Sequence, residues 1–216
     1  MCAFSQTPVT VSLSALDEVK QQAPAYDRRK QAIIDSITGK LQPAAGLPRA
    51  YNNYLQLYEE YKAFKYDSAY HYARKLQEVA TQLNDPHRVA QARLKLAFTL
   101  VSAGLFKEAS DSLNLLNGAV MHDSLKMEYY QLMGRLYYDL ADFNNDSFHT
   151  PAYVAKGNHY LDSAIRLYSP GSFEYAYFSG LKDIRSGNKE QALLNYKQLM
   201  RWPHLSNHEI ALTAST

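Results

Sequence analysis

The sequence predicts an all-α fold built from repeated helix–turn–helix units and preceded by an N-terminal helix. After residue 49, apolar residues recur at steps of three and four along almost the whole chain, as amphipathic helices require. Glycine and proline are scarce, with 9 and 8 among 216 residues, which disfavours a turn-rich β-sandwich. Similar segments also recur, for instance around Ala69 and Ala109, and such recurrence is typical of a solenoid.

Composition narrows the class of protein. A hydrophobic fraction of 46% and a charged fraction of 20% are typical of a soluble globular chain. The net charge is only +2, and the longest basic run is Arg28-Arg29-Lys30, too little for a nucleic-acid interface on this segment. A single cysteine, Cys2, excludes an internal disulfide and a cysteine-based metal site.

Residues 1–12 indicate either the remnant of a secretory signal or an ordinary disordered terminus. Ala3-Phe4-Ser5 has small residues at the spacing that a signal peptidase reads, and a cysteine at position 2 could be the remnant of a lipoprotein signal. The charged and apolar regions that precede such a site are missing. We interpret Met1 as the start of a trimmed or mis-assigned exported chain, which favours a periplasmic location.

Residues 13–48 are expected to form an N-terminal helical segment. Ser14 with Asp17 resembles a helix start, Pro24 is expected to interrupt that helix, and a second helix is expected from Tyr26 to Leu41. The proline- and glycine-containing stretch 42–48 then ends the segment.

The best repeat copy is LAFTLVSAGLFKEASDSLNLL, residues 96–116. Ala97 and Ala109 take the small-residue places of the tetratricopeptide (TPR) pattern, and Gly104 makes the turn. Further copies begin at Met133-Gly134 and near Gly180, the last with a turn at Gly187. We therefore predict a TPR-like α-solenoid of about four repeats plus the N-terminal helix.

The expected repeats span residues 49–86, 87–122, 123–170 and 171–203, with a partial repeat at 205–216. The third contains an insertion, 141–159, and such insertions often belong to a binding surface. The partial repeat stops inside a helix that begins near Ser206, so we expect the natural protein to continue.

No pattern indicates an enzyme, a cofactor or a metal ion. The sequence contains no HExxH, GxSxG, phosphate-binding-loop or GxGxxG motif. His204 and His208 are four residues apart, but Pro203 places at least one of them in a loop and no third ligand is evident.

In a TPR stack the first helix of each repeat lines the concave surface. The residues expected to bind a ligand in this groove are Tyr51, Tyr54, Tyr58, Leu94, Phe98, Gln131, Arg135, Tyr138, Tyr177 and Leu181. Most are apolar or aromatic, and Arg135 and Gln131 add polar points. Such a surface suits peptide binding or stacking on sugars.

The segment YNNYLQLYEEY, residues 51–61, leaves two readings open. If Leu57 aligns with Ala97, the tyrosines face the groove; shifted by one, Tyr54, Leu57, Tyr61 and Phe64 form a packing seam. We expect a mixed outcome in which Tyr51 and Tyr58 are the better exposed pair.

The segments YxxYxxLYEEYKAFKYDSAYHYARK, DSLKMEYYQLMGRLYYDLADFNND and YLDSAIRLY resemble a Bacteroidetes family of exported TPR domains of unknown function. Members of that family continue into a transmembrane helix, a coiled coil and a LuxR-type helix-turn-helix region. The resemblance implies that this chain is the extracytoplasmic sensor part of a regulator tethered to the inner membrane. It carries no ligand or catalytic residues.

Three hypotheses of function follow. The first is a TPR sensor or interaction domain, possible as a homodimer, that binds a peptide or protein in its groove. The second is a glycan-binding module whose exposed tyrosines stack on sugars. The third is a scaffold whose groove is filled by its own N-terminal helix.

Overall fold

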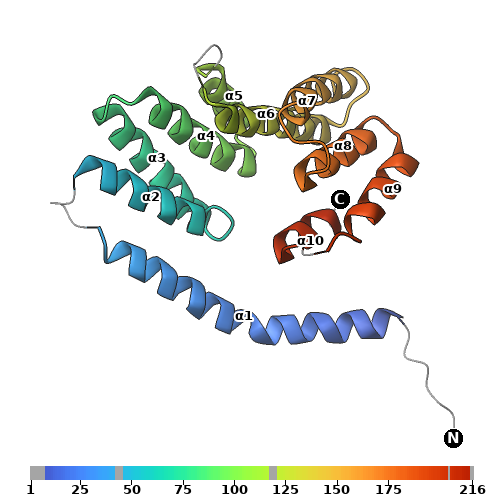
Figure 1. Ribbon diagram of the computed structural model, residues 1–216, viewed down its shortest axis with the longest axis horizontal. Coiled ribbons are helices and arrows are strands. Elements are labelled where there is room, and N and C mark those ends of the chain that lie inside the picture. The colour runs from blue at the N-terminus through green and yellow to red at the C-terminus, as the bar shows by residue number, and fades with distance from the viewer. Residues whose placement is uncertain (1–7, 42–45, 117–120, 204, 215–216) are drawn as a thin grey trace, which may run out of the picture. The chain divides into compact units, whose positions relative to one another are not determined.

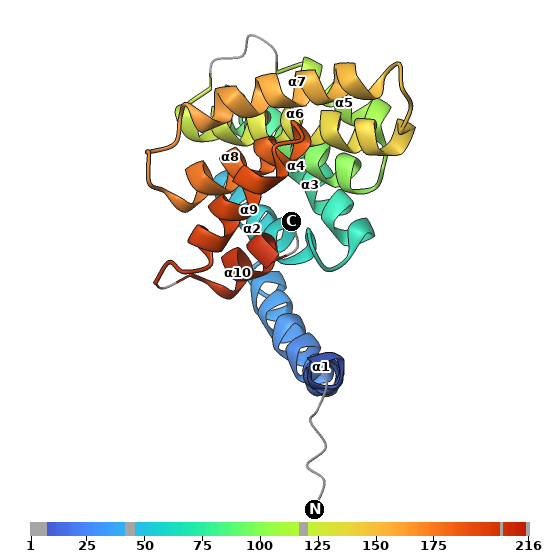
Figure 2. The ribbon, with the colours of Figure 1, turned by 90° about the vertical axis from the view of Figure 1, so that its right-hand side faces the viewer.

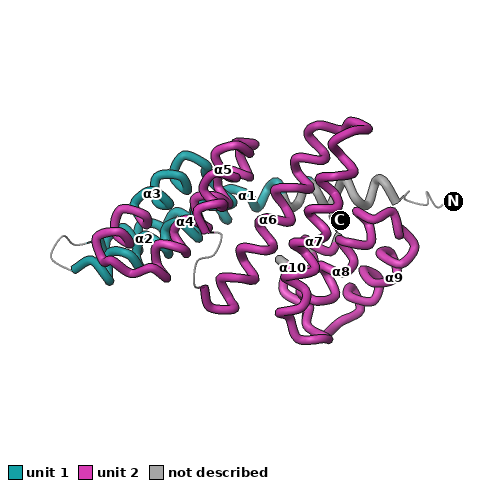
Figure 3. The backbone as a smooth tube through the Cα atoms, turned by 90° about the horizontal axis from the view of Figure 1, so that it is seen from above, with its two compact units in different colours: residues 1–75 teal, residues 76–216 magenta. Residues whose placement is uncertain are grey.

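The computed structural model describes residues 8–41, 46–116, 121–203 and 205–214, and every regular element in these ranges is an α-helix (Figure 1). The chain divides into two compact units, Met1–Lys75 and Leu76–Thr216 (Figure 3). The boundary falls inside helix α3, Tyr66–Gln82, so that this helix contributes to both units.

The N-terminal helix α1 runs without interruption from Pro8 to Thr38, with Pro24 in its interior. The expected break at Pro24 is therefore wrong. Proline removes one intrahelical hydrogen bond, and the break was expected for that reason. The flanking sequence QQA-P-AYDRRKQA is rich in good helix formers, which favours continuation through this position.

Unit 1 is held together by the contact of α1 with α2, Leu47–Tyr61. Ile34 and Ile37 of α1 are buried against Leu57 of α2, which has no exposed surface. The Asn53 side-chain amide donates a hydrogen bond to the Lys40 carbonyl at 3.3 Å. The C-terminal part of α1 is thus fixed by apolar burial, and the turn that follows it is fixed by a polar contact.

Unit 2 contains successive pairs of packed helices. They are α4 (Pro86–Ser102) with α5 (Phe106–Asn114), α6 (Asp123–Asn144) with α7 (Thr150–Ile165), and α8 (Phe173–Arg185) with α9 (Lys189–Leu199), followed by α10 (Asn207–Ala214). Figures 1 and 2 show α7 alongside α6. Within this unit α4, α6 and α8 lie on the inner side of the curve, and α5, α7 and α9 lie on the outer side.

The turns follow from local sequence. Gly104 and Gly187 adopt φ values of +73° and +84°, a region that glycine enters without steric cost. The Asp85 carboxylate caps α4 by accepting hydrogen bonds from the His87 and Arg88 N–H groups. Ser206 and Glu209 form a reciprocal capping box at the start of α10.

The stretch 141–159, expected to be an insertion, lies mostly in helices. Helix α6 continues to Asn144, and α7 already begins at Thr150. The turn between them is closed by Asp146, whose carboxylate accepts hydrogen bonds from the N–H groups of Phe148 and His149 at 2.7 and 2.6 Å. The additional residues therefore lengthen this helix pair instead of forming a long loop.

Candidate functional site

The tyrosine stripe of α2 is part of the core. Tyr51 is 2% exposed and Tyr58 is 1% exposed, so the expectation that these two form the better exposed pair is wrong. Burying such large rings is strongly favourable, and this gain outweighs the preference of the hydroxyl groups for water. Neither ring presents a free face to a ligand.

Tyr54 and Tyr61 are half-buried and pack around Tyr72 of α3. Their ring centroids lie 6.0 and 5.6 Å from that of Tyr72, and the second pair is stacked. With Leu57, Ile34 and Ile37 they form one apolar cluster. The seam reading is thus confirmed for Tyr54, Leu57 and Tyr61.

Phe64 is the exception within the expected seam. It contacts Tyr61 at a centroid distance of 6.5 Å but remains 47% exposed. The reason is its position beyond the end of α2, in the turn before α3.

Several residues expected in the groove of unit 2 are also buried. Leu94 has no exposed surface. Tyr138 is 3% exposed. Assigning these side chains to a ligand-binding surface was wrong, because α4 and α6 each bury a wider arc than the repeat pattern implies.

Tyr138 is a packing element between three helices. Its hydroxyl donates to Asn158 Oδ1 at 2.7 Å, and the Arg185 guanidinium carbon lies 4.9 Å from its ring centroid. Burial raises the pKa of the phenol well above its usual range, although nearby Arg185 opposes this shift. Tyr138 therefore stays a neutral hydrogen-bond donor.

Some of the residues that do reach the surface form a row of charged side chains beside Phe98 on the inner helices. Arg135 of α6 places its guanidinium carbon 5.1 Å from the Phe98 ring centroid on α4, and its Nε lies 3.3 Å from Asp139 Oδ2. Burial raises the pKa of Asp139, which Arg135 partly counteracts. The Arg135 side chain is still 41% exposed, so part of its donor fork can reach a ligand.

A second arginine continues this row onto α8. Arg185 donates from both terminal nitrogens to the Asp142 carboxylate at 2.6 and 2.9 Å, a bidentate geometry. We define the charged row as Phe98, Arg135, Asp139, Asp142 and Arg185. Sequence reasoning missed Asp142 and Arg185 because they lie 43 positions apart, and only the packing of α6 and α8 brings them together.

The other expected groove residues contact neighbours in their own repeats. Gln131 donates a hydrogen bond to the Tyr168 hydroxyl, and burial raises the pKa of Tyr168 to about 12. Tyr177 packs between Phe173 and Tyr196, with ring centroids 5.7 and 5.9 Å away. Leu181 is half-buried on the same helix, α8, so both α8 residues keep part of their surface exposed.

A row of half-buried tyrosines also runs between α6 and α7. Tyr137 stacks against Tyr153 and Tyr160 at centroid distances of 6.2 and 5.7 Å. Lys156 Nζ lies 5.3 Å from the Tyr137 ring centroid. The rings face one another, so their stacking surfaces are used within the protein.

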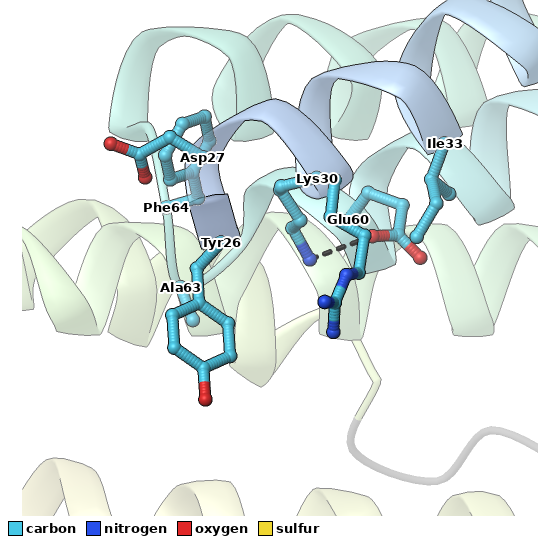
Figure 4. Close-up of a pocket in the computed structure, with 8 residues that line it drawn as sticks. Tyr26, Asp27, Lys30, Ile33, Glu60, Ala63 and Phe64 are labelled. Atoms are coloured by element: carbon cyan, nitrogen blue, oxygen red, sulfur yellow. Dashed lines mark ion pairs between the residues drawn. The ribbon is translucent and has the colours of Figure 1, made fainter. Parts of the chain in front are cut away.

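Unit 1 contains an open pocket of about 390 Å³ between the middle of α1 and the end of α2 (Figure 4). Tyr26, Ile33 and Phe64 provide its apolar lining. Beside them, Lys30 Nζ and Glu60 Oε2 form an ion pair at 2.6 Å.

No group of three or more His, Cys, Asp or Glu residues within the described ranges is placed to hold a metal ion. His204 and the side chain of His208 lie outside the described part.

Of the helices that the structure describes, none combines the length and apolarity needed to span a bilayer.

Paired antiparallel helices with small residues at their contacts, glycine turns and a polar row on the inner helices define a TPR protein. The structure is similar to the crystal structure of TTC0263, a thermophilic TPR protein in Thermus thermophilus, with a TM-score of 0.58 and 20% sequence identity over 77% of this chain and 80% of that chain. At this identity the similarity shows the fold alone.

The family model of the SusR N-terminal TPR domain matches residues 21–216. The chain therefore belongs to this Bacteroidetes family, as the resemblance implied. The search of curated proteins gave no significant match. TPR domains are generally non-enzymatic scaffolds that mediate protein–protein interaction.

Proposed function

We propose that this domain binds an extended peptide, or a segment of a partner protein, across the inner helices of unit 2. The observation that carries this proposal is the Arg135 guanidinium, which lies over Phe98 and is paired with Asp139 yet stays 41% exposed. Arginine recognises carboxylates through its planar fork of donors. A ligand carboxylate beside an aromatic or aliphatic side chain therefore suits this position.

The half-buried α8 residues extend the proposed surface. Tyr177 and Leu181 lie on the inner helix that follows α6, and Arg185 links the two helices through Asp142. Tyrosine supplies a large, rigid contact with a hydrogen-bonding tip. Gln131 and Arg135 are then the polar anchors, and Phe98 and Leu181 the apolar contacts.

The glycan hypothesis has lost its structural basis at α2. Exposed rings at Tyr51, Tyr54 and Tyr58 would have supported it, and the first and last of these are buried. The scaffold hypothesis stays a prediction: α1 packs on α2 within unit 1, and this contact does not involve the inner surface of unit 2.

A peptide-display library panned against the purified chain tests the proposal. The affinity of the selected peptides is then measured by calorimetry for the parent, Arg135→Ala and Lys107→Ala. Lys107 is a matched control because it also forms an i,i+4 ion pair, with Asp111, but on the outer helix α5. We expect Arg135→Ala to weaken binding about tenfold or more, since ionic hydrogen bonds contribute about 1.5–3 kcal/mol. Equal affinities for the parent and Arg135→Ala would contradict the proposal.

We further propose that the domain is the extracytoplasmic input part of a membrane-anchored transcriptional regulator. Membership of the SusR N-terminal TPR family supports this role, and Bacteroidetes envelope proteins are the source of that family. Fractionation of cells that carry a chromosomally tagged gene tests the location. Transcript sequencing after the Arg135→Ala exchange tests the regulatory role, and unchanged transcripts in inducing medium would contradict it.

A further inference from the structure

The middle of α1 is exposed within unit 1. Every residue from Lys20 to Arg29 is exposed, whereas Ile34 and Ile37 in the C-terminal part are buried. A helical segment that packs against nothing is only marginally stable in water. The exposed part of α1 would therefore gain stability from an apolar contact.

This part of α1 carries a stripe with heptad spacing. Ala23, Tyr26, Lys30 and Ile33 follow one another at steps of three and four, the spacing of a coiled-coil seam; the next member, Ile37, is buried within unit 1. At 100° per residue, Pro24 lies on the opposite side of the helix. Its missing N–H therefore does not interrupt the seam.

The stripe presents exposed apolar side chains. Tyr26 is 57% exposed and Ile33 is 44% exposed. With Phe64 they line the open pocket of unit 1 (Figure 4). The Arg29 guanidinium carbon lies 5.8 Å from the Tyr26 ring centroid, and Arg29 lines the same pocket.

We propose that this stripe binds the α1 helix of a second copy of the chain in an antiparallel orientation. The two-fold axis lies between Ala23 and Tyr26, so that each Tyr26 ring packs on the small Ala23 of the other copy. A large residue opposite a small one fills such a seam without strain. This proposal does not depend on peptide binding by unit 2.

The charges beside the stripe select the second copy and the orientation. Lys20 and Asp27 flank the stripe on the same side, seven residues apart. Antiparallel pairing brings Lys20 of each copy beside Asp27 of the other, which makes two ion pairs of the kind that set partner choice in coiled coils. Parallel pairing would place Asp27 beside Gln22 of the second copy, without this attraction.

Analytical ultracentrifugation of the whole chain over a range of concentrations gives the dimer dissociation constant. The proposal is tested by comparing this constant between the parent and variants in which a charge is reversed. Lys20→Glu or Asp27→Lys alone converts both attractive pairs into repulsive ones. Each exchange should weaken the dimer about tenfold, given typical energies of exposed pairs. An equimolar mixture of these two variants should form a heterodimer in which both pairs are attractive again, with the affinity of the parent.

Arg28→Glu is the matched control. It makes the same change of charge on the same helix, but on the side away from the stripe, and it should leave the dimer constant unchanged. A parent chain that stays monomeric at all concentrations would overturn the proposal. So would a mixture of the two variants that dimerises no better than either alone, because the antiparallel pairing requires this recovery.

Discussion

The ring of Tyr138 lies against the backbone of Gly157, so closely that a Cβ atom at Gly157 would stand 2.4 Å from Tyr138 Cε1. This contact joins α6 to α7, and the Arg185 guanidinium carbon of α8 lies 4.9 Å from the centroid of the same ring. Because Tyr138 is also hydrogen-bonded to Asn158, the ring cannot move aside without losing these contacts.

Gly157→Ala should therefore destabilise the protein. Alanine improves helix propensity by about 1 kcal/mol, but overpacking costs about 1–3 kcal/mol, so we expect a net loss in the free energy of unfolding by urea. Gly134→Ala is the control, since the Cβ there would meet its nearest atom at an ordinary 3.5 Å. A Gly157→Ala variant as stable as Gly134→Ala would contradict the described packing.

Truncation of Tyr51 or Tyr58 should also be costly. Both rings are buried, and removing a buried aromatic side chain typically costs about 3–5 kcal/mol. Tyr70→Ala serves as the control because Tyr70 is 38% exposed on α3. Thermal and urea unfolding should separate the buried pair clearly from the control, and three similar losses would argue that the α2 tyrosines are not core.

Asp139 gives a prediction with a definite sign. Its folded-state pKa is raised, chiefly by burial, so the folded protein binds this proton more tightly than the unfolded chain does. The contribution of Asp139 to stability is full below the unfolded pKa and is lost as the pH rises through the folded pKa. Asp139→Asn should consequently gain stability relative to the parent as the pH rises above about 4, the ordinary pKa of an aspartate. Urea unfolding at a series of pH values measures this difference. A loss of stability in Asp139→Asn relative to the parent would show that Arg135, and not burial, dominates the pKa of Asp139.

The Arg185–Asp142 pair should couple α6 and α8 measurably. Its geometry is bidentate and the Arg185 side chain is only 26% exposed, so a double-mutant cycle with Arg185→Ala and Asp142→Ala should give about 0.5–1 kcal/mol. A cycle on Lys107 and Asp111, which are 79% and 60% exposed, should give less. The reverse order would mean that the linking pair contributes little to the α6–α8 contact.

Local sequence signals predicted the fold well. The local backbone conformation determines the turns at Gly104 and Gly187. The small residues Ala97 and Ala109 are recognisable because they recur at fixed places of the repeat pattern. The continuation of α1 through Pro24 was not predicted. A proline disfavours a helix and the good helix formers around it favour one, and the sequence alone does not show which effect is larger.

The site was harder to predict than the fold. A shift of one residue in the repeat register decides whether a tyrosine of α2 lies in the seam or on the surface. The pattern alone therefore did not predict the burial of Tyr51 and Tyr58. The partnership of Arg185 with Asp142 arises from tertiary packing. Arg135 was expected as a polar point of the groove, and its partner Asp139 lies four residues later on the same helix.

Photo-crosslinking tests the central claim, binding across the inner helices of unit 2, most directly. A photoreactive phenylalanine is placed at Phe98, Leu181 or Leu115 in separate variants, and each is irradiated with a selected peptide. Leu115 is the control because it is 66% exposed and follows the outer helix α5. We predict crosslinks from positions 98 and 181 and none from 115. Crosslinks from 115 alone would place the ligand on the outer surface and contradict the proposed function.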